Sequence, residues 1–145
     1  MTGKKYGRVI FVRHGESIWN VNDPARGLVS RFTGWVDVPL TEKGLQQAEA
    51  SGRCLKMFDI KYDAVYTSLL SRSKQTFQRM HMTAGFSSDV PLTSSWRLNE
   101  RHYGALVGLS KDEAAHQLGH ENVMKWRKSW RTAPPKRRAM GHWDV

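Results

Sequence analysis

A short apolar run near the start of the chain, Val9 to Val12, stops abruptly at the charged turn Arg13-His14-Gly15-Glu16. The run is rich in β-branched residues and is bounded by charged ones, so it predicts a buried strand over residues 8–12. In open α/β sheets, ligands bind beyond the carboxyl ends of the strands. The sequence therefore predicts a binding or catalytic site directly after Val12.

Strand and helix patterns alternate along the rest of the chain. The predicted strands cover residues 63–68 and 90–95, and the predicted helices begin at Thr41, near Ser71, at residue 111 and near Glu121, the last ending at Trp130. Ser110 and Glu113 have the spacing of a capping box, which supports the helix over residues 111–118. This order of elements is typical of an α/β domain.

Composition excludes several classes of protein. The chain has 145 residues, of which 39% are hydrophobic, and it has one cysteine, Cys54. No apolar run approaches the roughly 18 residues of a membrane-spanning helix, and no secretory signal precedes the first predicted strand. The lone cysteine excludes an intramolecular disulfide framework. We therefore expect a cytoplasmic protein without a membrane partner.

The formal net charge of +10 is concentrated near the C-terminus. Seven of the 23 Lys and Arg residues lie between Lys125 and Arg138, while residues 1–124 hold the other 16 against 12 acidic residues, a net charge of +4. A basic tail alone is usually a solvated terminus. A moderately basic body suits a phosphorylated small molecule, so nucleic acid is not the expected partner.

The charged turn after Val12 has the residue types that phosphoryl transfer needs. A neutral His14 can attack phosphorus and form a phosphohistidine. Arg13 carries a planar, permanently charged fork that matches phosphate oxygens, and Gly15 lets backbone N–H groups approach an anion. The alternative interpretation is a strand that ends in an ordinary polar turn.

Two later motifs strengthen the phosphate interpretation. Arg72 is expected in the first turn of a helix that follows a strand, so its guanidinium and that of Arg13 can converge on one phosphate. The segment Trp96 to Gly104 contains Glu100, which can act as general acid and base if burial raises its pKa. Arg101 and Tyr103 in the same segment can hold a carboxylate or phosphate. Taken alone, the segment is also compatible with a surface loop of ion pairs.

Together these motifs resemble the cofactor-dependent phosphoglycerate mutases of the histidine phosphatase superfamily. The matching segments occur in family order over residues 8–130. They are Arg13 to Asn20, Arg31 to Gly44, Tyr66 to Ser68 with Arg72, Trp96 to Gly104, Gly108 to Lys111 and Trp126 to Ser129.

The resemblance implies a role for each matching position. His14 corresponds to the phosphorylated nucleophile and Glu100 to the proton donor and acceptor, with Arg13 and Arg72 completing the catalytic set. The implied substrate-binding positions are Arg13, Asn20, Thr33, Gly34, Arg72, Glu100, Arg101, His102, Tyr103, Lys111, Arg127 and Lys128.

The implied reaction interconverts 3-phosphoglycerate and 2-phosphoglycerate through 2,3-bisphosphoglycerate, which also primes the histidine, and it uses no metal. An isomerase of this kind serves glycolysis and gluconeogenesis, and full-length members commonly form homo-oligomers. One alternative is a bisphosphoglycerate mutase or a phosphatase that uses the same histidine. Another is an inactive fragment that binds anions, a partner chain or nucleic acid.

The resemblance also implies a three-layer α/β/α fold that is incomplete at its C-terminus. Residues 1–130 correspond to the N-terminal part of the domain, and residues 131–145 are a divergent basic tail. The family's second His-Gly segment has no counterpart, because no apolar strand precedes His142. We expect exposed apolar surface, an unpaired strand edge and a chain that alone is unstable or inactive. Cooperative unfolding together with mutase turnover by residues 1–145 would refute this.

Overall fold

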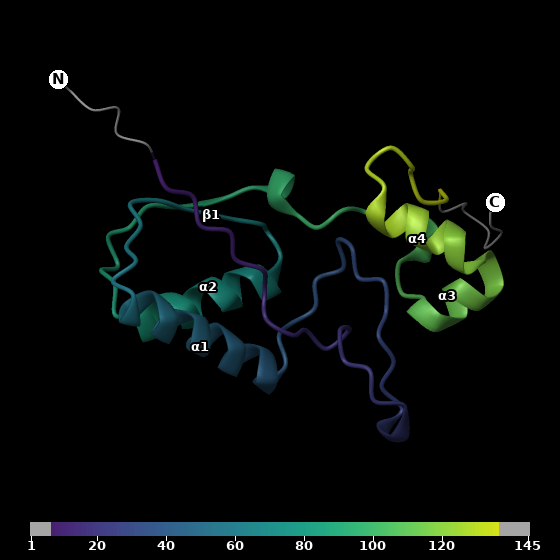
Figure 1. Cartoon of the computed structure of the whole chain (residues 1–145), viewed down its shortest axis with the longest axis horizontal. Coiled ribbons are helices and arrows are strands. Elements are labelled where there is room, and N and C mark those ends of the chain that lie inside the picture. Colours follow the sequence, from purple (N-terminus) through teal and green to yellow (C-terminus); the bar gives the residue numbers. More distant parts are fainter. Residues whose placement is uncertain (1–6, 137–145) are drawn as a thin grey trace.

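A small parallel sheet and the helix that connects its strands organise one half of the structure (Figure 1). In the computed structural model, which describes residues 7–136, strands β1 (Val65–Thr67) and β2 (Leu92–Ser94) pair in parallel. Helix α2 (Ser71–Ala84) forms the crossover that parallel strands require. Both strands therefore end at the same edge of the sheet, where α2 begins and where the segment containing Glu100 follows.

Helix α1 (Glu42–Met57) packs along α2 (Figure 1). It begins after Thr41, whose hydroxyl accepts a hydrogen bond from the Gly44 N–H, as expected of an N-cap. The helices approach closely at Gly52, where a Cβ atom would overlap the Met80 carbonyl oxygen. The core between the helices contains Leu55, Met80 and Ala84, with Ile60, Tyr62, Phe77 and Phe86 packed against it.

A second core lies around α3 (Lys111–Leu118) and α4 (His120–Lys128). It consists of Phe32, Leu106, Ala114, Val123 and Trp126. The predicted capping of α3 is confirmed, because the Ser110 hydroxyl accepts from the Glu113 N–H. The helix α4 ends two residues before the predicted Trp130.

Three short 3₁₀ helices complete the described elements: η1 (Pro24–Arg26), η2 (Trp96–Leu98) and η3 (Gly104–Leu106). The Ala105 N–H donates to the Pro135 carbonyl, so chain beyond residue 130 contacts η3. Residues 137–145, including His142, lie outside the described residues. The domain boundary at residue 130 stays a prediction.

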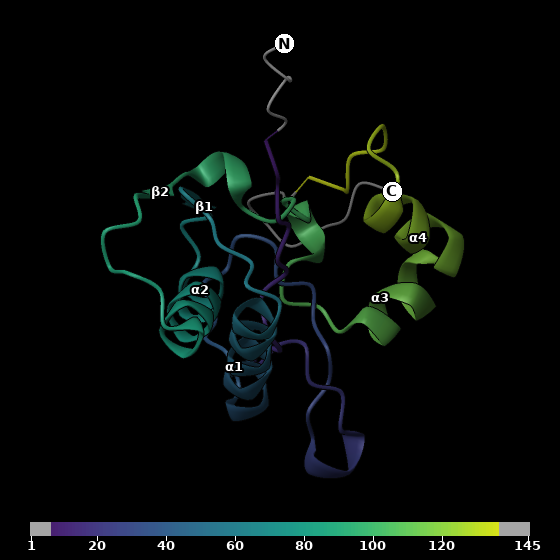
Figure 2. The same ribbon diagram turned by 60° about the vertical axis from the view of Figure 1, so that its left-hand side comes forward.

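The prediction of a buried strand over residues 8–12 is wrong. This segment is an irregular extended trace (Figure 2). Val9 is 73% and Phe11 94% exposed. A β-branched run forms a buried strand only where a neighbouring strand pairs with its backbone and apolar side chains cover it. In residues 7–136, β1 pairs with β2 and not with this segment. The expected exposure of apolar surface agrees with these values.

The architecture is α/β, as predicted, with helices and one parallel sheet among residues 7–136. Among residues 7–136, no helix is long and apolar enough to span a membrane.

Candidate active site

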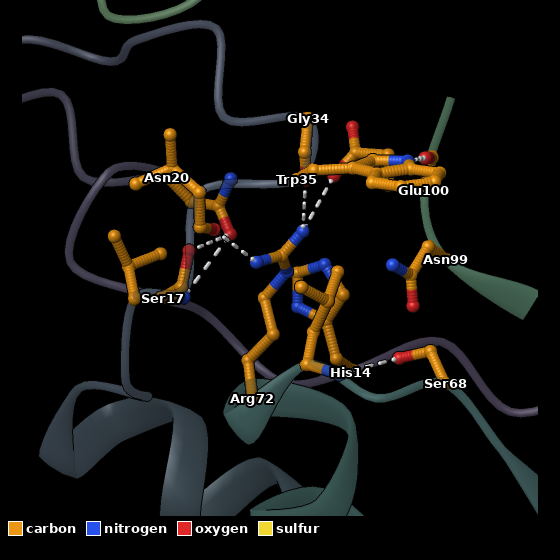
Figure 3. Close-up of polar contacts among 12 residues, drawn as sticks. His14, Ser17, Asn20, Gly34, Trp35, Ser68, Arg72, Asn99 and Glu100 are labelled. Atoms are coloured by element: carbon orange, nitrogen blue, oxygen red, sulfur yellow. Dashed lines mark hydrogen bonds and ion pairs between the residues drawn. The ribbon is translucent and has the colours of Figure 1, made fainter. Parts of the chain in front are cut away.

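The guanidinium of Arg72 is the centre of the site (Figure 3). Arg72 is the second residue of α2 and is 1% exposed. Its Nη1 donates to the Val36 carbonyl at 3.0 Å, and its Nη2 donates to the Gly34 carbonyl at 2.8 Å and to Glu100 Oε2 at 3.0 Å. A buried charge is tolerated when its N–H groups are accepted in this way. Arg72 therefore joins α2, the loop at residues 34–36 and the segment after β2.

Glu100 lies at the edge of the sheet where β2 ends. Its carboxylate pairs with Arg72, and its backbone carbonyl accepts a hydrogen bond from Trp35 Nε1 at 2.7 Å. The expected burial of the carboxyl group is not observed, since 37% of the side chain is exposed. The reason is its position in a loop beyond the strand. The role of Glu100 in proton transfer stays a prediction.

The ring of His14 has a defined hydrogen-bonding arrangement. Its Nδ1 lies 2.7 Å from the Gly15 carbonyl oxygen. A carbonyl oxygen can only accept, so Nδ1 carries the hydrogen and Nε2 keeps its lone pair in the neutral ring. Burial lowers the pKa of His14 below its ordinary value, and the positive charges of Arg72 and Arg13 also lower it. The hydrogen bond to the Gly15 carbonyl acts to raise the pKa, but the lowering effects together outweigh it. The site therefore favours a neutral ring with a nucleophilic Nε2.

Gly15 has a different role from the one expected. Its N–H, predicted to approach an anion, donates instead to Thr76 Oγ1 at 3.0 Å. A Cβ atom at Gly15 would overlap the Gly44 carbonyl oxygen at the start of α1. Glycine is thus required here by the close approach of two backbone segments.

Further charged groups act on the same site. Burial raises the pKa of Tyr103, and the negative charge of Glu100 raises it further by a smaller amount. Burial also lowers the pKa of Lys111, and the charges of Arg127 and Arg13 act in the same direction. Five cationic side chains thus influence the surroundings of Glu100 and His14: Arg13, Arg72, Arg101, Lys111 and Arg127. Such a cluster favours a ligand with several negative charges.

Other predicted substrate-binding residues make contacts within the protein. Asn20 Oδ1 accepts from the Ser17 N–H at 3.0 Å and from its hydroxyl at 2.8 Å. The Arg101 guanidinium donates to the carbonyls of Trp126 and Ser129 at the end of α4. These contacts are structural, and the roles of Asn20 and Arg101 in binding substrate stay predictions.

Three more predicted positions lie around the site or away from it. Thr33 is buried beside Gly34, and the exposed His102 accepts from the Gly104 N–H through Nδ1 at 2.9 Å. Lys128 lines a shallow depression on α4 together with His120 and Met124. Among residues 7–136, Lys128 makes no hydrogen bond or ion pair with His14, Arg72 or Glu100.

Three residues that the sequence did not indicate hold the site in place. Trp35 binds the Glu100 carbonyl, Thr76 accepts from Gly15, and Gln47 Oε1 accepts from the Glu16 N–H at 2.8 Å. The position of Thr76 one helical turn after Arg72 is the signal that could have indicated it. The indole and the amide act on backbone groups far away in sequence, which no local pattern reveals.

The lowered pKa of His14 predicts how stability depends on pH. The unfolded chain binds a proton at the ordinary pKa of 6.5, while the folded chain binds it only at lower pH. The free energy of unfolding should therefore fall as the pH drops below 6.5. Urea unfolding from about pH 8 to about pH 5 tests this, with His14→Asn as the control. The prediction fails if the substitution leaves the pH dependence unchanged.

A histidine with a free Nε2 lone pair, a buried arginine and further cations is the combination of groups that phosphoryl transfer requires. The sequence model of the histidine phosphatase superfamily (branch 1) matches residues 9–143. The chain belongs to this superfamily.

Within this superfamily, the chain is similar to curated proteins named as phosphoglycerate mutases. The chain is 46% identical over 130 residues to 2,3-bisphosphoglycerate-dependent phosphoglycerate mutase 2 of Latilactobacillus sakei, covering 88% of this chain and 52% of the relative. It is 47% identical over 128 residues to 2,3-bisphosphoglycerate-dependent phosphoglycerate mutase of Streptococcus pneumoniae, with coverage of 88% and 52%. The chain spans about half the length of the curated relatives it matches.

Solved structures share the fold. Bacillus stearothermophilus YhfR is 32% identical, with a TM-score of 0.61 over 79% of this chain and 50% of that protein. The mycobacterial glucosyl-3-phosphoglycerate phosphatase in complex with VO3 is 26% identical, with a TM-score of 0.66 over 83% and 51%.

Proposed function

We propose that this chain carries the nucleophile half of a 2,3-bisphosphoglycerate-dependent phosphoglycerate mutase site, so that a phosphoryl group exchanges with His14 while complete mutase turnover by residues 1–145 alone is not expected. The observation that carries the proposal is the bond between His14 Nδ1 and the Gly15 carbonyl, which leaves Nε2 free for attack. The names of the curated relatives support the choice of substrate.

In the proposed step, His14 Nε2 attacks a phosphorus atom of the bisphosphorylated substrate. A bond forms between nitrogen and phosphorus, and the bond from phosphorus to the glycerate oxygen breaks. Glu100 gives a proton to the leaving oxygen and is left as the carboxylate that pairs with Arg72, and monophosphoglycerate departs. In the reverse step, the other monophosphoglycerate isomer accepts the phosphoryl group from His14 on its free hydroxyl, whose proton passes to Glu100. This regenerates 2,3-bisphosphoglycerate and completes the isomerisation.

The donor groups fit a polyanionic substrate. Arg72 keeps the arrangement of Glu100 and residues 34–36 fixed, so little reorganisation is needed during transfer. Arg13, Lys111 and Arg127 supply positive charge that would hold the phosphates and the carboxylate. Within residues 7–136, no three His, Cys, Asp or Glu side chains form a group that could hold a metal ion.

The proposal extends to the setting of the reaction. A mutase of this kind would act in glycolysis and gluconeogenesis in the cytoplasm, and the full-length protein would form homo-oligomers. The names of the curated relatives support the enzyme class from which this setting is inferred.

The fate of the phosphoryl group on His14 tests the substrate assignment. The chain is first phosphorylated with labelled 2,3-bisphosphoglycerate, separated from it, and then mixed with 3-phosphoglycerate. A mutase site should return the label to the glycerate and form 2,3-bisphosphoglycerate. Release of the label as inorganic phosphate at the same rate with and without 3-phosphoglycerate would contradict the mutase assignment.

The phosphatase alternative has its own support. The similar solved structures include a glucosyl-3-phosphoglycerate phosphatase. In that case water would accept the phosphoryl group from His14, and release of inorganic phosphate in the same experiment would identify this activity.

A further inference from the structure

Two peptide groups follow His14, and a different helix holds each of them. The N–H of the first, at Gly15, donates to Thr76 Oγ1 on α2 at 3.0 Å. The N–H of the second, at Glu16, donates to Gln47 Oε1 on α1 at 2.8 Å. The carbonyl of this second peptide, that of Gly15, accepts from the His14 ring at 2.7 Å. The ring is thus connected to α1 through one peptide group.

The geometry of a peptide group makes the contact with Gln47 directional. A trans peptide is planar, and its N–H and C=O point in opposite directions. When Gln47 holds the N–H of Glu16, the Gly15 carbonyl is aimed away from Gln47 and toward the ring. Hydrogen bonds in a chain also polarise one another, so this contact strengthens the carbonyl as an acceptor. Gln47 therefore favours the ring form with hydrogen on Nδ1.

Thr76 links the nucleophile to Arg72. Its side chain is 4% exposed, and its hydroxyl donates to the Arg72 carbonyl at 2.8 Å while it accepts from Gly15. Threonine is a weak helix former because its branched side chain is restricted. Despite this low helix propensity, its side-chain oxygen here forms hydrogen bonds both to the backbone after His14 and to the turn of α2 that carries Arg72. The hydroxyl therefore fixes the separation between the nucleophile and that arginine.

We propose that Thr76 and Gln47 are positioning residues that hold His14 with hydrogen on Nδ1 and with Nε2 free for attack. The proposal rests on the proposed role of His14 as nucleophile. Two of the measurements that test it, hydrogen exchange of the Gly15 amide and the ¹⁵N chemical shifts of the His14 ring, are made on the free protein. They require no substrate and are therefore independent of catalysis.

The test compares matched pairs of variants in the full 145-residue chain. Thr76→Val removes the hydroxyl and keeps the shape, whereas Thr76→Ser keeps the hydroxyl. Gln47→Met removes the acceptor on the exposed surface of α1, where folding is not at risk. Ser51→Ala is the control, because the Ser51 hydroxyl binds only the Gln47 backbone carbonyl one turn earlier.

Three measurements are made on each variant: hydrogen exchange of the Gly15 amide, ¹⁵N chemical shifts of the His14 ring, and the rate of His14 phosphorylation by 2,3-bisphosphoglycerate. We expect Thr76→Val to speed Gly15 exchange by about tenfold or more, since the amide loses its acceptor. Gln47→Met should shift the ring toward a mixture of the two neutral forms. Both should slow phosphorylation by about tenfold, while Thr76→Ser and Ser51→Ala remain close to wild type.

Each outcome has a distinct meaning. Ring shifts and Gly15 exchange that match wild type in both Thr76→Val and Gln47→Met would overturn the inference. If Thr76→Val does not fold, the ring shifts of Gln47→Met decide the result. A wild-type chain that keeps hydrogen on Nδ1 but never becomes phosphorylated would contradict the proposed function and leave the positioning inference supported by the ring shifts.

Discussion

Replacing Arg72 with methionine should slow phosphorylation of His14 by on the order of 10³-fold, the lower end of the effect of arginines in phosphoryl transfer. The physical reason is that one buried guanidinium orders three groups: the carbonyls of Gly34 and Val36 and the carboxylate of Glu100. Removing it leaves the carbonyls without this donor and Glu100 without its partner. We also expect the free energy of unfolding to fall by about 3 kcal/mol.

Two variants make this result interpretable. Arg79→Met removes an arginine from the same helix, where it forms a half-exposed pair with Glu49, and should cost less than about 1 kcal/mol. Arg72→Lys keeps the charge but loses the planar fork, so it should recover only part of the rate. Equal rates and equal denaturation midpoints for Arg72→Met and Arg79→Met would show that Arg72 does not organise the site.

Replacing His14 with asparagine should abolish covalent phosphorylation of the chain by 2,3-bisphosphoglycerate. The asparagine amide can still donate to the Gly15 carbonyl, so the turn should keep its shape while the nucleophile is lost. His116→Asn, at a position on α3, serves as the control for a histidine outside the site. Phosphate labelling followed by peptide mass spectrometry measures the effect. Label retained by His14→Asn would assign the nucleophile to another residue.

Local signals in the sequence predict most of the helical structure. Thr41 and Ser110 cap their helices, and Gly85 ends α2 in the left-handed conformation. Each of these signals works within a few residues of the chain, so it can be read without knowledge of the fold. The two strands β1 and β2 also lie within the predicted ranges, and the α/β class follows from the order of elements.

The failed prediction of a strand over residues 8–12 has a physical cause. The pattern of Val9 to Val12 shows that the segment is suited to a sheet, but strand pairing depends on neighbours that a local pattern does not contain. The role of Gly15 was missed for a related reason. Its Cβ is excluded by Gly44, a residue from another part of the chain.

The centre of the site was more predictable than its support. His14 follows the apolar run Val9 to Val12, and Arg72 and Glu100 each follow a predicted strand. The structure brings Arg72 and Glu100 into contact and places the charges of both near His14. Gln47 and Trp35 act on backbone groups, and many side chains can make such contacts. Only the folded geometry shows which of them do.

The central claim is that the chain presents Nε2 of His14 as its nucleophile. The most direct measurement is ³¹P and ¹⁵N NMR of the chain after reaction with 2,3-bisphosphoglycerate, which identifies the ring nitrogen that carries phosphorus. The hydrogen bond from Nδ1 to the Gly15 carbonyl predicts phosphorus on Nε2 of His14. Phosphorus on Nδ1, or an unmodified His14 in a folded chain, would contradict the account.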